Sequence, residues 1–460
     1  MSALELDDIQ GLILRGYRKE MACHVVLQIV ERGRFQALLA DLADENLETG
    51  PFVTVAADWR DKPPVGVPAS HCVNLGFTFT GLETLVSDDT ALESFPDAFR
   101  EGADERAEGR AGETGNNHPD RWETSLRGKD AHAIVSVYAD SLDELEDVLR
   151  DVLERIDGAA KELDRFHANR LDGKDVEHFG YEDGLSQPTI EGLEPRVGLD
   201  DPFPRVPAGE FVLGQQAQPG HPWEPMPEPE QLGRNGSFAA FRVMSQDVAA
   251  FHAFLATEAD RTGIEPELLA AKLCGRWRNG EPLMMRSPGD PPDHVPRDER
   301  NMFDYEATAA YPEGDPEGLR CPRGAHIRRA FPRSQRVVDD FDGFQRRIVR
   351  RGMPYGPMFD PDRPTEEPRG LVGHFICASL ANQYEYMMLR WLNDGLFTGR
   401  RLGRTKDPLA GANEPAHSRF VIPGTPDVEL TGFTQFVRTR GCLYLFLPSM
   451  TALRYLARVG

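Results

Sequence analysis

The chain has 460 residues, and its 75 Asp and Glu outnumber its 52 Lys and Arg, which gives a net charge of −23 at pH 7. This length exceeds that of one ordinary domain and leaves ample core to bury a cofactor. The acidic excess disfavours nucleic acids and anionic membrane surfaces as partners, because like charges repel.

Apolar patterns in the first 198 residues predict one small domain. Alternation predicts strands, and helical spacing predicts helices, in the order strand 24–31, helix 34–43, strands 72–81 and 133–139, helix 141–156 and strand 165–171. Glu144 follows Ser141 by three residues, which is a capping-box pattern at the start of the second helix. Strand, helix, two strands, helix and strand is the ferredoxin-like order.

The second half echoes this order without a visible sequence repeat. The pattern predicts strand 237–243, helix 248–258, strands 347–350 and 370–377, helix 384–392 and strand 442–447. The expected fold class is therefore α+β with two ferredoxin-like domains. We place the N-terminal domain at 1–198, a Pro-rich linker at 199–236 and the C-terminal domain at 237–460.

Three polar stretches interrupt these elements. Residues 101–122 are dense in Gly, Glu, Asp and Arg, and we expect a mobile surface loop there. Residues 200–235 hold many prolines and predict a linker or a wrapping arm. Residues 286–320 are again rich in Pro and Asp, and such a long excursion is either a functional covering or disordered.

Cysteine spacing and hydropathy bear on location. The six cysteines contain no C-x-x-C pair, fit neither a zinc site nor a disulfide framework, and predict free thiols in a reducing compartment. The first residues, M-S-A-L-E-L-D-D, have neither a signal-peptide pattern nor a twin arginine. No run of about 18 apolar residues occurs. We expect a cytoplasmic protein without a membrane partner.

His326 is the candidate ligand for a metal cofactor. It lies in C-P-R-G-A-H-I-R-R-A-F-P-R, residues 321–333, between a turn and a strand-like segment with Arg328, Arg329 and Arg333. A neutral imidazole is a good axial ligand for haem iron, and arginines suit the anionic haem propionates. Taken alone the pattern is weak, because a lone histidine is more often structural. Cys321 competes with His326 as a ligand, and a small buried residue is the preferred interpretation of it.

Two further segments point the same way. Residues 178–188 read H-F-G-Y-E-D-G-L-S-Q-P, and residues 346–356 read R-R-I-V-R-R-G-M-P-Y-G. With the segment around His326, they resemble the signature of the dye-decolorising peroxidases, in the order of that family. The family's G-x-x-D-G motif matches Gly180, Asp183 and Gly184, its proximal histidine matches His326, and its distal arginine matches Arg350.

The resemblance implies a haem peroxidase of dimeric α+β-barrel type, with one haem b per chain held mainly by the C-terminal domain. Such an enzyme reduces H2O2 and oxidises bulky phenols or dyes, which are aromatic electron donors, in one-electron steps. His326 would bind iron, Asp183 would move a proton, and Arg350 would supply positive charge on the distal side. The alternative is a protein that stores haem or releases its iron with little turnover. An oligomer is left open.

Several residues compete for these roles. Asp183 fits an Asx turn or a helix cap equally well from sequence alone. Strand alternation puts Arg350 on the face of Arg346 and opposite Arg347 and Arg351, so only the resemblance singles it out. His178 is an alternative distal acid–base group.

The N–H of His326 needs an acceptor, because a carboxylate there makes the imidazole more electron-rich. By rough position relative to the family, Asp394 is our candidate for this part of the cofactor site, and Glu385 is the second choice.

Overall fold

The structure is a computed structural model, and it describes residues 4–43, 53–57, 71–194, 204–219, 225–335, 344–395, 397 and 405–459. The strands are β1 (Met21–Ile29), β2 (His71–Phe77), β3 (Ala133–Ala139), β4 (Ala160–Asn169), β5 (Ser237–Gln246), β6 (Val349–Tyr355), β7 (Gly370–Cys377), β8 (Arg419–Ile422), β9 (Val428–Thr431) and β10 (Val437–Leu447).

The longer helices are α2 (Arg32–Leu42), α7 (Leu142–Ile156), α9 (Val248–Thr262) and α10 (Pro266–Cys274). Shorter ones are α1 (Gly11–Leu14), α3 (Phe79–Leu85), α4 (Asp89–Glu93), α5 (Asp97–Glu101), α6 (Ala103–Arg106), α8 (Glu230–Gly233), α11 (His326–Ala330) and α12 (Met450–Leu456). Three segments are π-helical: η1 (Ala107–Ala111), η7 (Leu380–Glu385) and η8 (Met387–Leu392). Short 3-10 turns are η2 (Gly115–Asn117), η3 (Pro119–Arg121), η4 (Thr124–Leu126), η5 (Ala208–Glu210) and η6 (Arg297–Glu299).

Eight strands form one sheet in the order β4-β1-β3-β2-β10-β5-β7-β6, and every pair of neighbours is antiparallel. Numbered within its own half, each set of four strands has the spatial order 4-1-3-2, which is the ferredoxin-like arrangement. The two halves meet where β2 pairs with β10 at Phe77 and Phe446. The predicted α+β class with two ferredoxin-like units is therefore confirmed, and the domain boundaries themselves stay a prediction.

The sheet curls into a barrel. Strands β4 and β6, at opposite ends of the strand order, lie in contact. His24 on β1 has its ring centroid 5.2 Å from that of Phe241 on β5 and 5.4 Å from that of His374 on β7. These strands are not neighbours in the sheet, so their side chains meet only because one face of the sheet turns inward.

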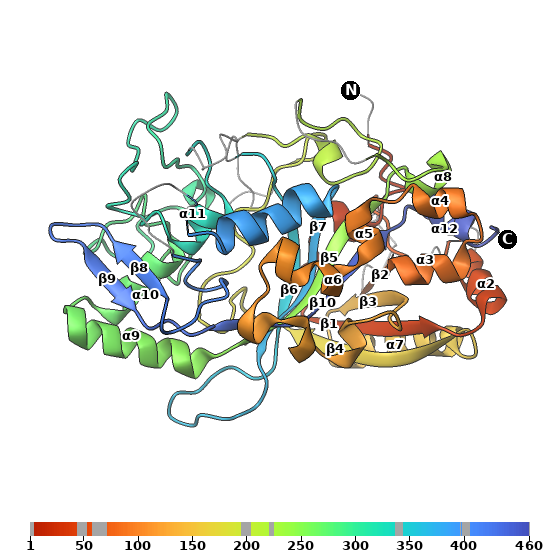
Figure 1. Cartoon of the computed structure of the whole chain (residues 1–460), viewed down its shortest axis with the longest axis horizontal. Coiled ribbons are helices and arrows are strands. Elements are labelled where there is room, and N and C mark those ends of the chain that lie inside the picture. Colours follow the sequence, from red (N-terminus) through yellow and green to blue (C-terminus); the bar gives the residue numbers. More distant parts are fainter. Residues whose placement is uncertain are drawn as a thin grey trace.

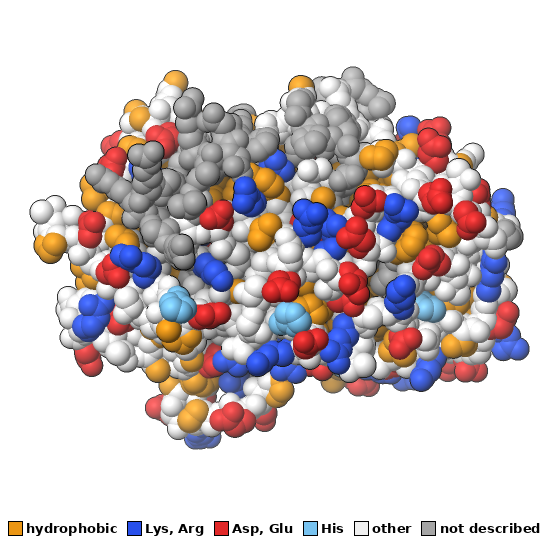
Figure 2. Space-filling model, viewed as in Figure 1, with side chains coloured by type: hydrophobic (Ala, Val, Ile, Leu, Met, Phe, Trp, Pro, Cys, Tyr) orange, Lys and Arg blue, Asp and Glu red, His pale blue; other side chains and the backbone are white. Residues whose placement is uncertain are grey.

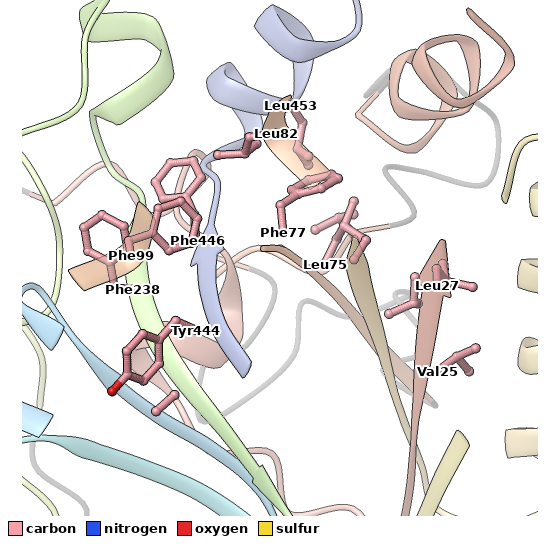
Figure 3. Close-up of a cluster of buried hydrophobic side chains, with 14 of the residues drawn as sticks. Val25, Leu27, Leu75, Phe77, Leu82, Phe99, Phe238, Tyr444, Phe446 and Leu453 are labelled. Carbon is pink, nitrogen blue, oxygen red and sulfur yellow. The ribbon is translucent and has the colours of Figure 1, made fainter. Parts of the chain in front are cut away.

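The outer face of the sheet carries the larger core. Figure 3 shows side chains from both halves of the sheet in one cluster, including Leu75 and Phe77 of β2 beside Phe446 of β10 and Phe238 of β5. Leu82 of α3, Phe99 of α5 and Leu453 of α12 cover them. Alternating apolar residues thus bury both faces of the strands. In Figure 1, α9, α10, α11 and the β8–β9 hairpin lie at one end of the sheet, and α2, α3, α4 and α12 lie at the other.

Local signals for helix α7 behave as the sequence predicts. Ser141 caps the helix, and its Oγ accepts a hydrogen bond from the backbone N–H of Glu144 at 3.3 Å. The Glu144 carboxylate reaches back to the N–H of Asp140 at 3.2 Å. The buried face holds apolar residues at helical spacing: Leu145, Val148, Leu149, Val152 and Ile156.

The prediction of a mobile loop at 101–122 is wrong. This segment forms α6 and the helical turns η1, η2 and η3, and it buries Arg106, Glu113 and Trp122. Arg106 donates to both carboxylate oxygens of Glu385, each at 2.7 Å, and Arg242 donates to Glu113 at 2.5 Å. Two charged residues of the segment thus form buried ion pairs with distant residues, while most of the other charged side chains lie on its exposed face.

Other boundaries shift by a few residues. Strand β6 begins at Val349, so Arg346 and Arg347 precede it, and β4 begins at Ala160. The helix expected at 384–392 is part of the π-helical pair η7 and η8, and the strand-like segment after His326 is the short helix α11. In the described part of the Pro-rich stretch, Phe211 and Val212 are fully buried and pack in one cluster with residues of the sheet.

On the face seen in Figure 2, basic and acidic side chains are interspersed, so the net negative charge is not gathered there in one patch. Within the described ranges, no helix combines the length and apolarity needed to cross a lipid bilayer.

Candidate active site

His326 is the first residue of α11 and is held by a buried carboxylate. Its Nδ1–H donates to Oδ2 of Asp407 at 2.9 Å. Oδ1 of Asp407 accepts the backbone N–H groups of Leu409 and Ala410 at 2.9 and 2.8 Å. The Asp407 side chain is fully buried, whereas that of His326 is 33% exposed. Nε2 of His326 has no hydrogen-bond partner among the described residues and is left to bind another group.

Charges around the pair fix its protonation. Burial opposes the charged form of His326, but the charge and the hydrogen bond of Asp407 outweigh it, so the pKa of His326 lies above its ordinary value. Burial likewise opposes ionisation of Asp407, yet His326 and the N–H of Ala410 hold the pKa of that carboxyl below its ordinary value. Asp407 is therefore a carboxylate that accepts the proton on Nδ1.

The expectation that Asp394 or Glu385 accepts this N–H is wrong. The Asp394 carboxylate lies 3.7 Å from Arg390. Glu385 is buried on the far side of η7, where Arg106 and the hydroxyl of Tyr444 bind it. Asp407 lies 81 residues after His326 in the sequence. Its stretch, K-D-P-L-A-G, reads as an ordinary turn, so no local signal identified it.

Asp183 follows a tight hairpin in which Val176 pairs with Glu182. Gly180 has a φ of +91° at the turn, a conformation that only glycine adopts readily. Asp183 is half-buried, and its Oδ1 accepts the N–H of Gly184. A Cβ placed on Gly184 would meet no atom within 4 Å, so the backbone beside Asp183 is not packed against other residues on that side.

A buried carboxylate shapes this hairpin. Glu177 accepts the N–H groups of Tyr181 and Phe179, both at 2.9 Å, and Nε2 of Gln246 at 2.5 Å. Burial raises the pKa of Glu177. Since Gln246 ends β5, the contact attaches the hairpin to the second half of the sheet. Glu182, the neighbour of Asp183, instead forms ion pairs with Arg297 and Arg300. Its carboxylate is therefore neutralised by these two arginines.

His178 is tied down by the backbone. Its Nε2 lies 2.8 Å from the carbonyl oxygen of Tyr355, so this nitrogen donates. Burial lowers the pKa of His178. With one nitrogen bound and the ring 3% exposed, His178 is poorly placed to shuttle protons, and Asp183 stays the preferred candidate.

Arg350 joins β6 to the Asp183 segment. Its Nη2 donates to the carbonyl oxygen of Leu185 at 2.7 Å, and its backbone N–H donates to Oε1 of Gln187 at 3.1 Å. The positive charge of Arg350 acts on His326 and opposes its protonation. Glu177, in the hairpin before Asp183, also acts on His326 through its charge, so His326, Arg350 and this hairpin lie within electrostatic reach of one another.

The three competing arginines have other contacts. Arg351 lies on the opposite face of β6 and donates to the carbonyl oxygen of Leu12 at 2.9 Å. The Arg347 guanidinium lies 3.7 Å from the ring centroid of Phe331, and that of Arg346 lies 3.6 Å from the ring centroid of Tyr386. Arg347 also donates to the segment after the G-x-x-D-G motif, at the carbonyl oxygen of Ser186 at 3.1 Å, so Arg350 shares that segment with it.

These residues fit a haem. An imidazole with its Nδ1–H held by a carboxylate and its Nε2 left without a hydrogen bond is the usual arrangement of a metal-bound histidine. Cys321 does not compete, because it is fully buried and burial raises the pKa of its thiol to about 11. The thiolate that would bind iron is therefore disfavoured.

Comparison with known proteins gives consistent matches. A family model described as the DyP dimeric alpha+beta barrel domain matches residues 8–170. The chain is 27% identical to the dye-decolorizing peroxidase msp1 of Mycetinis scorodonius, over 98% of this chain and 88% of that protein. It is 26% identical to the multifunctional dye peroxidase DyP2 of an Amycolatopsis strain, over 99% of this chain and 96% of that one.

Solved structures agree. A dye-decolorizing peroxidase in complex with 2,6-dimethoxyphenol superposes with a TM-score of 0.81 at 26% identity, over 99% of this chain and 100% of that one. A fungal DyP-type peroxidase from Auricularia auricula-judae has a TM-score of 0.82 at 24% identity, over 99% of this chain and 100% of that one, and it shares the fold.

Proposed function

The chain belongs to the dye-decolorising peroxidase family, and from this premise we propose that it is a haem b peroxidase with one haem per chain. It reduces H2O2 and oxidises bulky phenolic or dye-like molecules in one-electron steps. The haem supplies the redox chemistry when bound. The protein contributes a ligand, a proton carrier and a fixed charge.

Nε2 of His326 is the proposed ligand for iron. Asp407 accepts the opposite N–H and keeps the ring in the tautomer that leaves Nε2 free. The negative charge of Asp407 makes the imidazole a stronger donor, which favours the oxidised states of the metal.

Asp183 and Arg350 act on the peroxide side. A carboxylate within hydrogen-bond reach can take the proton from one peroxide oxygen and deliver it to the other. The guanidinium of Arg350, held in place by Leu185, stabilises the negative charge that develops as the O–O bond breaks.

Two further observations support the proposed donors and location. The relative solved with 2,6-dimethoxyphenol supports phenols as reducing substrates. All six cysteines are unpaired and buried, which supports a reducing, cytoplasmic location.

The contact between His326 and Asp407 carries the proposal, and replacement of His326 tests it. His326→Ala should lose most bound haem and its Soret absorbance, because the variant lacks the imidazole nitrogen proposed to bind the iron. His178→Ala is the matched control and should keep its haem, since His178 bonds to the backbone of Tyr355. Full haem content in His326→Ala would refute the ligand. Haem-loaded wild type that fails to turn over H2O2 with a phenol would favour haem storage instead.

A further inference from the structure

Arg329 is a buried cation that binds carbonyl oxygens rather than a carboxylate. Its side chain is fully buried. It donates to the carbonyl oxygens of Trp391 and Thr405, both at 2.6 Å, and to that of Asp394 at 3.1 Å. Longer contacts reach Oγ1 of Thr405 at 3.2 Å and the carbonyl oxygen of Gly324 at 3.3 Å. Burying a charge in this way costs free energy, so a specific role is expected.

The carbonyl groups belong to the three segments that build the His326–Asp407 pair. Gly324 lies in the turn before His326, Trp391 and Asp394 lie at the end of η8, and Thr405 lies two residues before Asp407. The N–H of Asp407 donates to the carbonyl oxygen of Leu392 at 2.7 Å. The end of η8 therefore holds Asp407 directly, and Arg329 ties both η8 and the Asp407 segment to the helix of His326.

We propose that Arg329 is a positioning residue that sets the distance and direction of the hydrogen bond from His326 to Asp407, and so the electron donation of His326 to bound iron. The inference rests on the proposed role of His326 as the ligand. A planar guanidinium with five N–H groups can span three backbone segments at once, which an ammonium cannot. Arg329 itself does not touch the cofactor in this role.

Arg328 provides a matched contrast within the same short helix. It is equally buried, and its donors also reach carbonyl oxygens, those of Cys321 at 2.6 Å and Asp315 at 2.8 Å. Its guanidinium faces the ring of Tyr305 and lies 3.4 Å from the Asp315 carboxylate. It thus anchors the opposite side of α11, away from Asp407.

The experiment compares Arg329→Gln with Arg328→Gln in the haem-loaded protein. Resonance Raman spectra of the ferrous form give the iron–imidazole stretching frequency, and spectroelectrochemistry gives the reduction potential. Arg329→Gln should lower that frequency and raise the potential, because a looser hydrogen bond to Asp407 leaves the imidazole less electron-rich. Arg328→Gln should leave both at the wild-type values, although both variants lose a buried arginine.

Arg329→Lys gives a second measurement if the Gln variant does not fold. Lysine keeps the charge but cannot bridge three carbonyl groups, so both readouts should shift in the same direction by a smaller amount. Unchanged values in the Arg329 variants would overturn the inference. A higher iron–imidazole stretching frequency in Arg329→Gln would also overturn the inference. The change would then reflect loss of the positive charge of Arg329 and not a looser hydrogen bond from His326 to Asp407. Absence of an iron–imidazole band in wild type would instead refute His326 as the ligand.

Discussion

Two neighbouring arginines on β6, Arg350 and Arg351, contact different parts of the molecule. Arg350 points to the segment after Asp183 and donates to Leu185, whereas Arg351 points to the barrel interior and donates to Leu12. The two have the same charge and nearly the same backbone, and the alternation of side chains along a strand separates them. They are therefore a matched pair for testing the distal charge.

Arg350→Leu should slow the reaction with H2O2 at least tenfold while haem stays bound. Removal of one preorganised charge or donor from such a site typically costs about 2.7–4 kcal/mol, or roughly 10²–10³ in rate. Stopped-flow recording of the Soret band after mixing with H2O2 measures the rate. Arg351→Leu should react at the wild-type rate.

Asp183→Asn should be slow as well, since an amide cannot take the peroxide proton. We expect the loss to be smaller than in Arg350→Leu, because a water chain can replace a proton carrier more readily than a fixed charge. A wild-type rate in Arg350→Leu would refute the assignment of that residue.

At the scale of elements, α6 is bound by hydrogen bonds to η7, the first of the two consecutive π-helical segments η7 and η8. Arg106 of α6 makes two hydrogen bonds to Glu385 of η7, and Tyr444 of β10 donates to the same carboxylate at 2.9 Å. The side chains of Arg106 and Glu385 are only 9% and 4% exposed. The end of η8 accepts the N–H of Asp407 through Leu392. By fixing η7, the Arg106–Glu385 ion pair therefore also helps to hold the segment of Asp407 in place.

Arg106→Met should therefore lower the free energy of unfolding by about 3–5 kcal/mol, the usual effect of leaving a buried charge without its partner. The double variant Arg106→Met, Glu385→Gln should recover a large part of that loss. Urea unfolding of the single and double variants measures both. As a surface control, Arg150→Ala removes an exposed pair with Asp147 and should cost less than about 1 kcal/mol. If Arg106→Met and Arg150→Ala lowered the free energy of unfolding by the same amount, the buried ion pair of Arg106 would contribute no more than a surface pair.

At the scale of the whole molecule, closing the barrel buries two histidines that a flat sheet would expose. Nδ1 of His24 forms a hydrogen bond with Oγ of Ser136 at 2.8 Å. The ring of His24 also packs against those of His374 and Phe241. Burial lowers the pKa of His374 to about 3 and that of His24 well below its ordinary value. Both rings are neutral in the folded barrel.

This burial makes folding stability dependent on pH. Unfolded histidine has a pKa of about 6.5, so between that value and about 3 the unfolded chain binds more protons at His374 than the folded one does. The stabilisation is complete above about pH 6.5 and is lost as the pH falls, by up to about 1.4 kcal/mol per pH unit for each such histidine.

His374→Phe should therefore flatten the fall in stability between pH 6.5 and pH 4, because phenylalanine does not titrate and fits beside Phe241. Urea unfolding at a series of pH values measures the slope. An identical slope in wild type and variant would show that His374 does not limit stability in acid.

Local sequence signals identified what depends on a few adjacent residues. Gly180 and Asp183 belong to a turn whose backbone needs glycine, Ser141 and Glu144 cap one helix, and apolar alternation marks the strands. His326, Asp183 and Arg350 lie in short motifs that resemble those of a known family, so they could be proposed as site residues before any contact was known. The ferredoxin-like order likewise follows from the succession of elements along the chain.

Only the tertiary structure decided the contacts between distant segments. Asp407, rather than Asp394 or Glu385, reaches His326, because the turn at 405–407 is attached to η8 through Leu392. Arg106 and Glu113 look solvent-exposed in the polar stretch 101–122, but Glu385 and Arg242 bind them in the interior. An ion pair across hundreds of residues leaves no periodic trace in the sequence, since periodicity records only which face of an element is buried.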